Sequence, residues 1–338
     1  MKSPKHANIA LFIPHNGCKH QCSFCNQKSI TGAVAQPGPK DVERAVKTAV
    51  SSRMGGAKSC ELAFFGGSFT AVEEGYMLSL LEAAYPFVRE GVIDGIRVST
   101  RPDAVDEHKL SLLKKYGVTA VELGAQSMDD EVLVKNRRGH TASEVASASA
   151  LIRERGFSLG LQMMTGLYGS DGQKDFDTAK KLAALSPDTM RVYPTVVLKY
   201  TALAMLYEAG EYHPMGLWES VALCARLLDF FEKQGIPVIK LGLQESETMK
   251  SDAIAGAVHP AFRELCEGER YLKRIAGEIK RQGLSPCSLK IRVHPREISK
   301  AVGQKRRNVI KLNDMGYRVQ FVGDEALAGM QIEVEKCG

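Results

Sequence analysis

The chain has 338 residues, of which 44% are hydrophobic and 25% charged, so it can bury a large core and form one large domain plus a small one. This composition excludes a largely disordered chain. No stretch approaches the roughly 20 apolar residues that span a bilayer, and at the N-terminus lysines precede only a short apolar run. We therefore expect a cytoplasmic protein with no membrane partner.

Short apolar runs alternate with longer helical patterns from Asn8 to about Leu241, and turn residues separate them. The expected strands are Ile9–Ile13, Cys60–Phe65, Gly95–Thr100, Val118–Leu123, Ser158–Met164, Thr189–Tyr193 and Val238–Leu241. The expected helices are Pro39–Ser51, Glu73–Val88, Asp106–Lys115, Ala142–Arg155, Lys174–Ala184 and Leu217–Lys233. Such repetition predicts an α/β fold in which parallel strands form a full or partial (β/α) barrel, with the active site after the strand ends. A doubly wound open sheet is the alternative.

The pattern changes after Gly242, where a polar stretch leads to a helix from about Pro260 to Gln282. A small α+β unit then follows a break at residues 283–286. It consists of the strand Leu289–Val293, the helix Pro295–Val302, a basic turn, the helix Arg307–Asp314 and the strand Tyr317–Val322. We therefore expect three parts, which are a barrel at residues 1–245, a helical linker at 246–283 and a small basic domain at 284–338.

Three of the eight cysteines, Cys18, Cys22 and Cys25, lie within eight residues after the first expected strand, with the spacing C-x-x-x-C-x-x-C. This clustering favours a metal site in a reducing compartment over a disulfide framework. Three thiolates suit a [4Fe–4S] cluster whose fourth iron stays open to a ligand. Zinc with His15 or His20 as the fourth ligand, and simple packing, are the alternatives. We interpret the remaining five cysteines as packing residues; they are Cys60, Cys224, Cys266, Cys287 and Cys337.

This spacing, with Phe24 before the third cysteine, is similar to the signature of the radical S-adenosylmethionine superfamily. Six further motifs follow in order, namely Phe65–Thr70, Thr100–Asp103, Glu122–Ser127, Asn136–Thr141, Met163–Asp171 and Tyr193–Thr195. Together they resemble the radical domain of the Elongator catalytic subunit, a tRNA wobble-uridine modifying enzyme, over roughly residues 8–245. The resemblance implies a partial barrel in which the three cysteines hold a [4Fe–4S] cluster that cleaves S-adenosylmethionine reductively to a 5′-deoxyadenosyl radical.

The resemblance also implies which residues bind S-adenosylmethionine. Gly66, Gly67 and Ser68 follow the second strand, where the bare glycine backbone can approach the methionine amino group. Gln126 and Arg138 are similar to residues that contact the ribose and the methionine carboxylate, and an arginine beside a carboxylate forms a charge-assisted pair.

Two other residues have open roles, and three features depart from the Elongator pattern. Glu122 is expected either to contact the cofactor or to form a structural ion pair, and Tyr193 either to close the pocket or to pack. The Elongator enzymes space their cysteines more widely, and Ser99 stands where they carry a glutamate. No segment after Gly242 resembles their acetyltransferase domain, so we do not expect the acetyl chemistry to carry over.

Positive charge gathers near the C-terminus, where the interval from Leu272 to Arg318 has 13 Lys and Arg residues against 3 Asp and Glu. The strand–helix–turn–helix–strand order there resembles a KH domain, whose Gly-x-x-Gly loop clamps a nucleic-acid backbone. The turn begins with Gly303 but has Arg306 in place of the second glycine. We expect Gly303, Lys305, Arg306 and Arg307 to contact nucleic acid, and a basic solvated surface is the alternative.

These patterns predict a radical enzyme that modifies a base of an RNA, with tRNA as the expected substrate, and receives electrons from a flavodoxin- or ferredoxin-type donor. The first alternative is a radical enzyme for a small molecule, similar to the oxygen-independent coproporphyrinogen oxidases, which share the Gln126 and Arg138 positions. The second is a nucleic-acid-binding protein with a structural or redox-sensing cluster.

Overall fold

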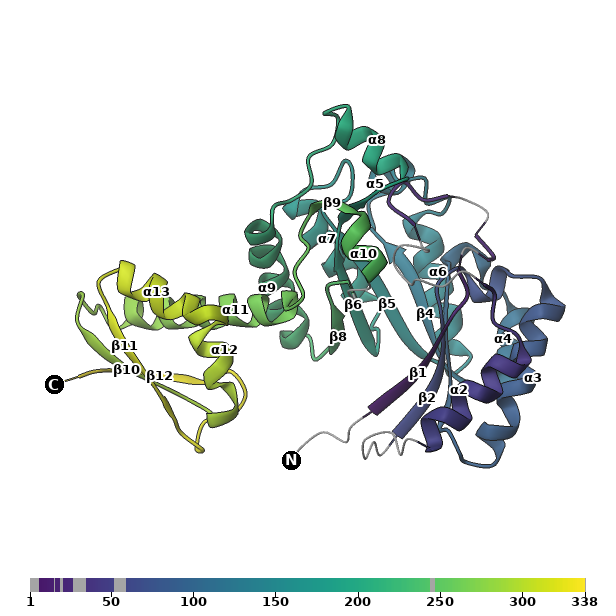
Figure 1. Ribbon diagram of the computed structural model, residues 1–338, viewed down its shortest axis with the longest axis horizontal. Coiled ribbons are helices and arrows are strands. Elements are labelled where there is room, and N and C mark those ends of the chain that lie inside the picture. Colours follow the sequence, from purple (N-terminus) through teal and green to yellow (C-terminus); the bar gives the residue numbers. More distant parts are fainter. Residues whose placement is uncertain are drawn as a thin grey trace. The chain divides into compact units, whose positions relative to one another are not determined.

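The computed structural model describes residues 6–14, 16–18, 21–26, 35–51, 59–243 and 247–337 (Figure 1). The chain forms two compact units. The barrel unit comprises residues 1–215 and 234–257, and the C-terminal unit comprises residues 216–233 and 258–338.

The barrel unit contains a parallel sheet of seven strands in the order β1-β2-β3-β4-β5-β6-β8. The strands are β1 (His6–Phe12), β2 (Ser59–Phe65), β3 (Gly95–Thr100), β4 (Val118–Gln126), β5 (Ser158–Thr165), β6 (Thr189–Pro194) and β8 (Val238–Leu241). Their order in space follows their order in the chain, whereas a doubly wound sheet reverses direction at a switch point. The first and last strands are the two edges of the described sheet, so the predicted partial barrel is confirmed.

Alternation along the strands separates a helix-covered face from an inner face. Leu62, Phe64, Ile96 and Val98 are fully buried on the first of these, and Figure 1 shows α2, α3 and α4 on the outer side of the sheet. The helices of this unit are α2 (Pro39–Ser51), α3 (Glu74–Arg89), α4 (Glu107–Lys115), α5 (Asp130–Lys135), α6 (Ala142–Glu154), α7 (Gly172–Ala184), α8 (Ala202–Glu208) and α10 (Glu247–Asp252). A small antiparallel pair joins β7 (Val196–Leu198) to β9 (Ala253–Gly256).

Side chains at the helix starts fix where several of these helices begin. The carboxylates of Asp106, Asp129 and Asp171 accept backbone N–H groups at the starts of α4, α5 and α7. Thr141 and Glu144 form a reciprocal capping box at the start of α6. These caps satisfy N–H groups that the first helical turn leaves unpaired, so the loops after the strands enter their helices at defined residues.

The C-terminal unit has a three-stranded sheet in the order β11-β10-β12. Strand β10 is parallel to β11 and antiparallel to β12. Its elements are α9 (Leu217–Lys233), α11 (Phe262–Arg281), β10 (Ser288–Val293), α12 (Ile298–Val302), α13 (Arg307–Asp314), β11 (Arg318–Gly323) and β12 (Ile332–Lys336). The sequence patterns predicted every one of these elements except β12.

The expected three-part division differs from the division that the structure shows. Helix α11, which we expected to be a linker, buries Leu272, Ile275 and Ile279 in one core with Leu289 and Ile291 of β10. Its apolar residues recur at helical spacing and therefore need a surface to cover them. Helix α9 also belongs to this unit, because Arg270 of α11 pairs with carboxylates of α9.

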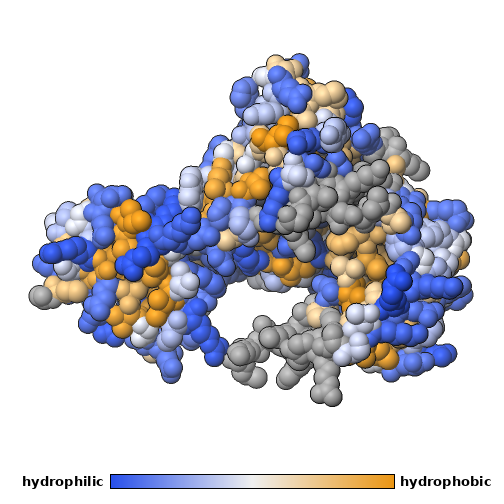
Figure 2. All heavy atoms as spheres, viewed as in Figure 1, coloured by the Kyte–Doolittle hydropathy of each residue, from blue (hydrophilic) through white to orange (hydrophobic). Residues whose placement is uncertain are grey.

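No helix within the described ranges is long and apolar enough to cross a membrane. Figure 2 shows a mainly hydrophilic surface on which apolar residues gather in separate patches.

Candidate active site

The predicted cysteine segment follows β1 at the carboxyl end of the sheet. The N–H of Ile13 donates to the carbonyl of Phe65 at 2.8 Å, so the chain stays beside β2 up to the segment. Cys22 is buried, and Cys18 and Cys25 are half-buried. The N–H of Cys25 donates to the carbonyl of Cys22 at 3.2 Å, which closes a tight turn between two of the three thiols.

The alternative zinc ligands, His15 and His20, lie outside the described residues. Among the residues that are described, no three His, Cys, Asp or Glu side chains surround a position for a single metal ion. A cubane cluster takes its thiolates at separate irons, so it accepts ligands that are spaced more widely than those of one ion.

Arg138 reaches the cysteine segment from the loop after α5. Its Nη1 donates to Sγ of Cys22 at 2.9 Å, and its Nη2 donates to the carbonyl of Gly124 at 2.6 Å. A Cβ atom at Gly124 would lie 2.9 Å from Nε2 of Gln126 and 3.6 Å from Nη2 of Arg138, so glycine leaves room for both side chains. The buried Nε of Arg138 has no partner among the described residues, so one donor remains for a ligand.

Asn136 anchors the same segment. Its Oδ1 accepts the hydroxyl of Ser23 at 2.8 Å, its carbonyl accepts the N–H of Ser23 at 3.1 Å, and its Nδ2 donates to the carbonyls of Val132 and Tyr168. The carbonyl of Ser23 accepts the N–H of Leu203 in α8 at 2.7 Å. Asn136 and Leu203 therefore hold Ser23, which lies between Cys22 and Cys25.

The predicted glycine pair contacts the chain that leads into the cysteine segment. Gly66 and Gly67 have φ angles of +76° and +51°, in the region that favours glycine. A Cβ atom at Gly67 would lie 2.3 Å from the carbonyl oxygen of Asn16. One at Gly17 would lie 2.3 Å from the carbonyl oxygen of Ser68. The turn after β2 and the chain before Cys18 thus touch backbone to backbone.

The structure gives Ser68 and Gln126 partners within the protein. The fully buried hydroxyl of Ser68 lies 2.9 Å from Oγ1 of Thr100 and accepts the N–H of Arg101. Gln126 ends β4 with a φ angle of +67°, which is uncommon for a residue with a side chain, and its Oε1 accepts from Gln162 at 3.2 Å. Contact of either residue with S-adenosylmethionine stays a prediction.

Glu122 belongs to a chain of buried ion pairs on the inner face of the sheet. It lies 3.2 Å from Nη1 of Arg97 and 2.6 Å from Nε of Arg191, and Arg97 also pairs with Glu61 at 2.8 Å. A Cβ atom at Gly160 would lie 2.7 Å from Cγ of Glu122, so this glycine lets the carboxylate reach across β5. Two carboxylates balance two guanidinium groups, which is the ion-pair role that we considered for Glu122.

Tyr193, near the end of β6, forms a side-chain hydrogen bond with Arg191. Burial raises the pKa of its phenol. It also packs against the apolar residues Met164 and Leu167. The hydroxyl of Ser99 lies 3.5 Å from Glu122, at the limit of a hydrogen bond.

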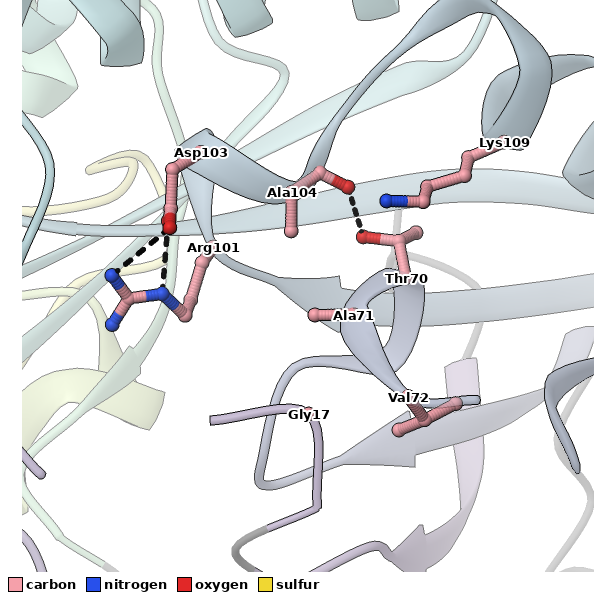
Figure 3. A pocket seen from close by; sticks show the side chains of 8 residues that line it. All are labelled: Gly17, Thr70, Ala71, Val72, Arg101, Asp103, Ala104 and Lys109. Carbon is pink, nitrogen blue, oxygen red and sulfur yellow. Dashed lines mark hydrogen bonds and ion pairs between the residues drawn. The ribbon is translucent and has the colours of Figure 1, made fainter. Parts of the chain in front are cut away.

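A cavity of about 180 Å³ lies beside the cysteine segment (Figure 3). Figure 3 shows the Arg101 guanidinium turned toward Asp103, with Nε 2.8 Å from Oδ1, while the hydroxyl of Thr70 donates to the carbonyl of Ala104. Arg101 also donates to the carbonyl of Arg138 and so fixes the backbone from which Arg138 extends. The lining residues are Gly17, Thr70, Ala71, Val72, Arg101, Asp103, Ala104 and Lys109.

Two buried titratable residues near the strand ends were not predicted. Burial, followed by the charge of Arg138, lowers the pKa of His140 to about 4, so the imidazole is neutral where it meets the carbonyl of Ala125 at 3.2 Å. Burial raises the pKa of Asp175 to about 7, although the N–H of Gly166 and the hydroxyl of Ser170 donate to its carboxyl. His140 lies within one motif of the resemblance and Asp175 lies four residues after another, but nothing in their spacing shows that they are buried.

Comparison with protein families identifies the family to which this chain belongs. Residues 12–182 match the Radical SAM superfamily, and residues 187–274 match the Radical_SAM C-terminal domain. The chain belongs to the radical SAM superfamily. It is therefore an enzyme, and its cofactors are a [4Fe–4S] cluster and S-adenosylmethionine.

Relatives of this radical SAM protein include enzymes that act on tRNA. It is 30% identical over 175 residues to the tRNA uridine(34) acetyltransferase of Dehalococcoides mccartyi, covering 46% of this chain and 38% of the relative. It is 33% identical over 137 residues to the Elongator complex protein 3 of Homo sapiens, covering 40% of this chain and 25% of the relative. The matches thus span well under half of these relatives.

Among solved structures, the fold resembles the Elp3 protein of the archaeon Methanocaldococcus infernus, with a TM-score of 0.60 and 20% identity. The similarity covers 83% of this chain and 64% of that one. The predicted resemblance to the Elongator radical domain is confirmed by these relatives and by this fold.

The residues of the radical SAM site fit the cluster and its ligand. Three thiols supply the soft donors that iron prefers. The guanidinium of Arg138 places a positive charge against Cys22, which suits an anionic cluster, and its unpartnered Nε can donate to a carboxylate. Burial, followed by the nearby Cys22, raises the pKa of Cys18, so the thiol must lose its proton when it binds iron.

The predicted nucleic-acid residues of the radical SAM protein separate into two groups. Gly303, Lys305 and Arg306 form the turn between α12 and α13, with φ angles of +79°, +51° and +59°. The Lys305 and Arg306 side chains are exposed. Arg307 instead begins α13 and pairs with Glu269 at 3.0 Å. Contact of all four residues with nucleic acid stays a prediction.

Proposed function

We propose that this radical SAM enzyme modifies a base of an RNA, with tRNA as the substrate class. The names of the relatives that share its radical domain support a tRNA substrate. The observation that carries the RNA assignment within this chain is the turn at residues 303–306. No described residue forms an ion pair with Lys305 or Arg306, so both cations are available to phosphates.

Each residue of the barrel site then has a physical task. Cys18, Cys22 and Cys25 hold the cluster, which when bound supplies the electron that cleaves S-adenosylmethionine. Arg138 neutralises charge at Cys22 and binds the methionine carboxylate through its remaining donor. Gly66 and Gly67 expose backbone at the end of β2 to the methionine amino group, and Gln126 contacts the ribose. The buried barrel interior excludes water from the reaction.

An external low-potential protein of the flavodoxin or ferredoxin type would reduce the cluster. The C-terminal unit would bind the RNA backbone through the Gly303–Arg306 turn in the manner of a KH loop, with arginine charge in place of the second glycine.

The RNA assignment is tested by filter binding of unfractionated tRNA to the anaerobic protein over a series of salt concentrations. The variant Lys305→Glu, Arg306→Glu should bind at least about tenfold more weakly and show a shallower salt dependence, because phosphate contacts release counterions. The matched control is Lys280→Glu, Arg281→Glu, which reverses two exposed adjacent cations at the end of α11 and should change binding less. Equal binding by the wild type and the turn variant would remove the turn from the RNA site, and no binding by the wild type would favour a small-molecule substrate.

A further inference from the structure

Trp218, in the first turn of α9, is the only tryptophan of the chain, and 46% of its surface is exposed. We propose that Trp218 is a base-stacking residue, on which an unpaired base of the bound RNA lies while the neighbouring turn holds the backbone. This inference rests on the proposed RNA substrate and adds a binding residue outside the predicted loop. All of the residues involved belong to the C-terminal unit.

The indole is held by a stacked arginine. The guanidinium carbon of Arg307 lies 3.7 Å from the centroid of the Trp218 ring, and Nη1 of Arg307 lies 3.0 Å from Oε2 of Glu269 in α11. Glu269 therefore fixes the guanidinium, and the guanidinium in turn covers one face of the ring. The exposed part of the indole must then lie on its other face and its edges, and a ring that is already fixed loses little freedom when a base stacks on it.

Free positive charge adjoins this stack. Arg307 directly follows Lys305 and Arg306, which are exposed. Lys311 lies one helical turn after Arg307, so both project from the same side of α13. No ion pair to Lys305, Arg306 or Lys311 is found within the described part of the chain. An aromatic plane bordered by unpaired cations is the arrangement by which proteins bind single-stranded nucleic acid.

Stability alone does not explain this arrangement. Arg307 already has a carboxylate partner and does not need the indole for its charge. An indole that served only packing would stabilise the fold more if it were covered, because its large apolar surface contributes most when buried. Tyr200, on the barrel unit, gives the contrast. It is 85% exposed, and among the described residues no cation lies over its ring. Exposure of an aromatic residue is thus combined with a fixed arginine and free cations at Trp218 and not at Tyr200.

The test uses the intrinsic fluorescence of Trp218 in the anaerobic, cluster-loaded protein. Unfractionated tRNA should quench the emission, and so should a single-stranded oligonucleotide of about ten residues. The same oligonucleotide annealed to its complement should quench less, because its bases are already stacked. Emission that stays unchanged at a tRNA concentration that saturates filter binding would overturn the inference.

Variants provide a second readout, which is the filter-binding affinity for tRNA. Trp218→Ala should weaken binding about tenfold, whereas Trp218→Phe should retain most of it because a ring remains. Arg307→Lys keeps the charge beside Glu269 but loses the planar guanidinium, and it should weaken binding by about threefold. Tyr200→Ala is the control and should bind as the wild type does.

Two failures are distinguishable. If tRNA binds but Trp218→Ala, shown by circular dichroism to be folded, binds equally well, the stacking role is wrong and the proposed RNA substrate stands. If the wild-type protein binds no tRNA under any salt condition, the proposed function and the stacking role both fail.

Discussion

Two sets of charged residues, one in each unit of the chain, differ in burial and in pairing. In the barrel unit, Glu61, Arg97, Glu122 and Arg191 are buried and pair with one another. In the C-terminal unit, Lys305 and Arg306 are exposed and have no ion-pair partner among the described residues. Buried paired charges hold a site in one geometry, whereas exposed unpaired charges remain free for a partner. The buried pairs thus hold the barrel site in place, and under the proposed function the exposed cations bind RNA.

After the loss of a cysteine of the cluster segment, the largest expected effect in the barrel unit follows from removing Arg138. Arg138→Ala should lower the rate of S-adenosylmethionine cleavage by about a thousandfold, because a buried cation then no longer faces Cys22 or the bound ligand. The measurement is 5′-deoxyadenosine formed per loaded cluster. Arg137→Ala, at the adjacent exposed position, is the matched control and should retain near wild-type activity. A fully active Arg138→Ala variant would contradict the proposed role of Arg138 beside Cys22.

Glu122→Gln tests whether the inner ion pairs are structural. The variant leaves the buried guanidinium groups of Arg97 and Arg191 short of one negative charge, so the free energy of unfolding should fall by about 3 kcal/mol. Thermal or denaturant unfolding measures this loss. Glu131→Gln removes a carboxylate from an exposed pair and should leave the free energy of unfolding almost unchanged. Equal losses in the two variants would contradict the distinction between buried and exposed charge.

Gly67→Ala sharpens the role of the glycine pair. The new Cβ would lie 2.3 Å from the carbonyl oxygen of Asn16, so the chain before Cys18 must move, at a cost of about 2 kcal/mol. The iron content after reconstitution should fall to less than half. Gly91→Ala has the same left-handed backbone conformation, but its Cβ would meet nothing within 4 Å, so the iron content should not change. Full iron loading of Gly67→Ala would show that the backbone contact is not needed.

The last comparison concerns the pH dependence of stability. Burial raises the pKa of Asp175 to about 7, so the folded protein keeps this proton to a higher pH than the unfolded chain does. The stabilisation is complete below the unfolded pKa of about 4 and is lost as the pH rises through about 7. Asp175→Asn should remove the part of this decline that Asp175 causes, seen as a flatter curve of unfolding free energy against pH. Asp177→Asn, on the exposed side of the same helix, should leave the decline as it is.

Local patterns predicted most of the fold. The seven strands of the barrel sheet and the long helices follow directly from apolar spacing and turn residues, and Cys18, Cys22 and Cys25 follow from their spacing. The short helices α5 and α8 were not predicted, because six or seven residues carry too little periodicity.

The features that the sequence did not predict depend on contacts between residues that are far apart in the chain. Asn136 meets Ser23 across 113 residues, and Arg191 meets Glu122 across 69. The sequence spacing of such pairs does not indicate that the two residues are in contact. The expected linker proved to be a core helix for the same reason, since an apolar stripe shows that a helix is covered but not by what. Trp218 and Arg307 are likewise brought together only by the fold.

The most direct test of the central claim is the formation of 5′-deoxyadenosine. The protein is reconstituted anaerobically with iron and sulfide, reduced with dithionite and given S-adenosylmethionine, with and without unfractionated tRNA. The wild type should form 5′-deoxyadenosine, more of it with tRNA, while Cys22→Ala should form none and Cys60→Ala, outside the segment, should retain activity. A fully loaded cluster that yields no 5′-deoxyadenosine under either condition would contradict radical chemistry at this site and favour a structural or redox-sensing cluster.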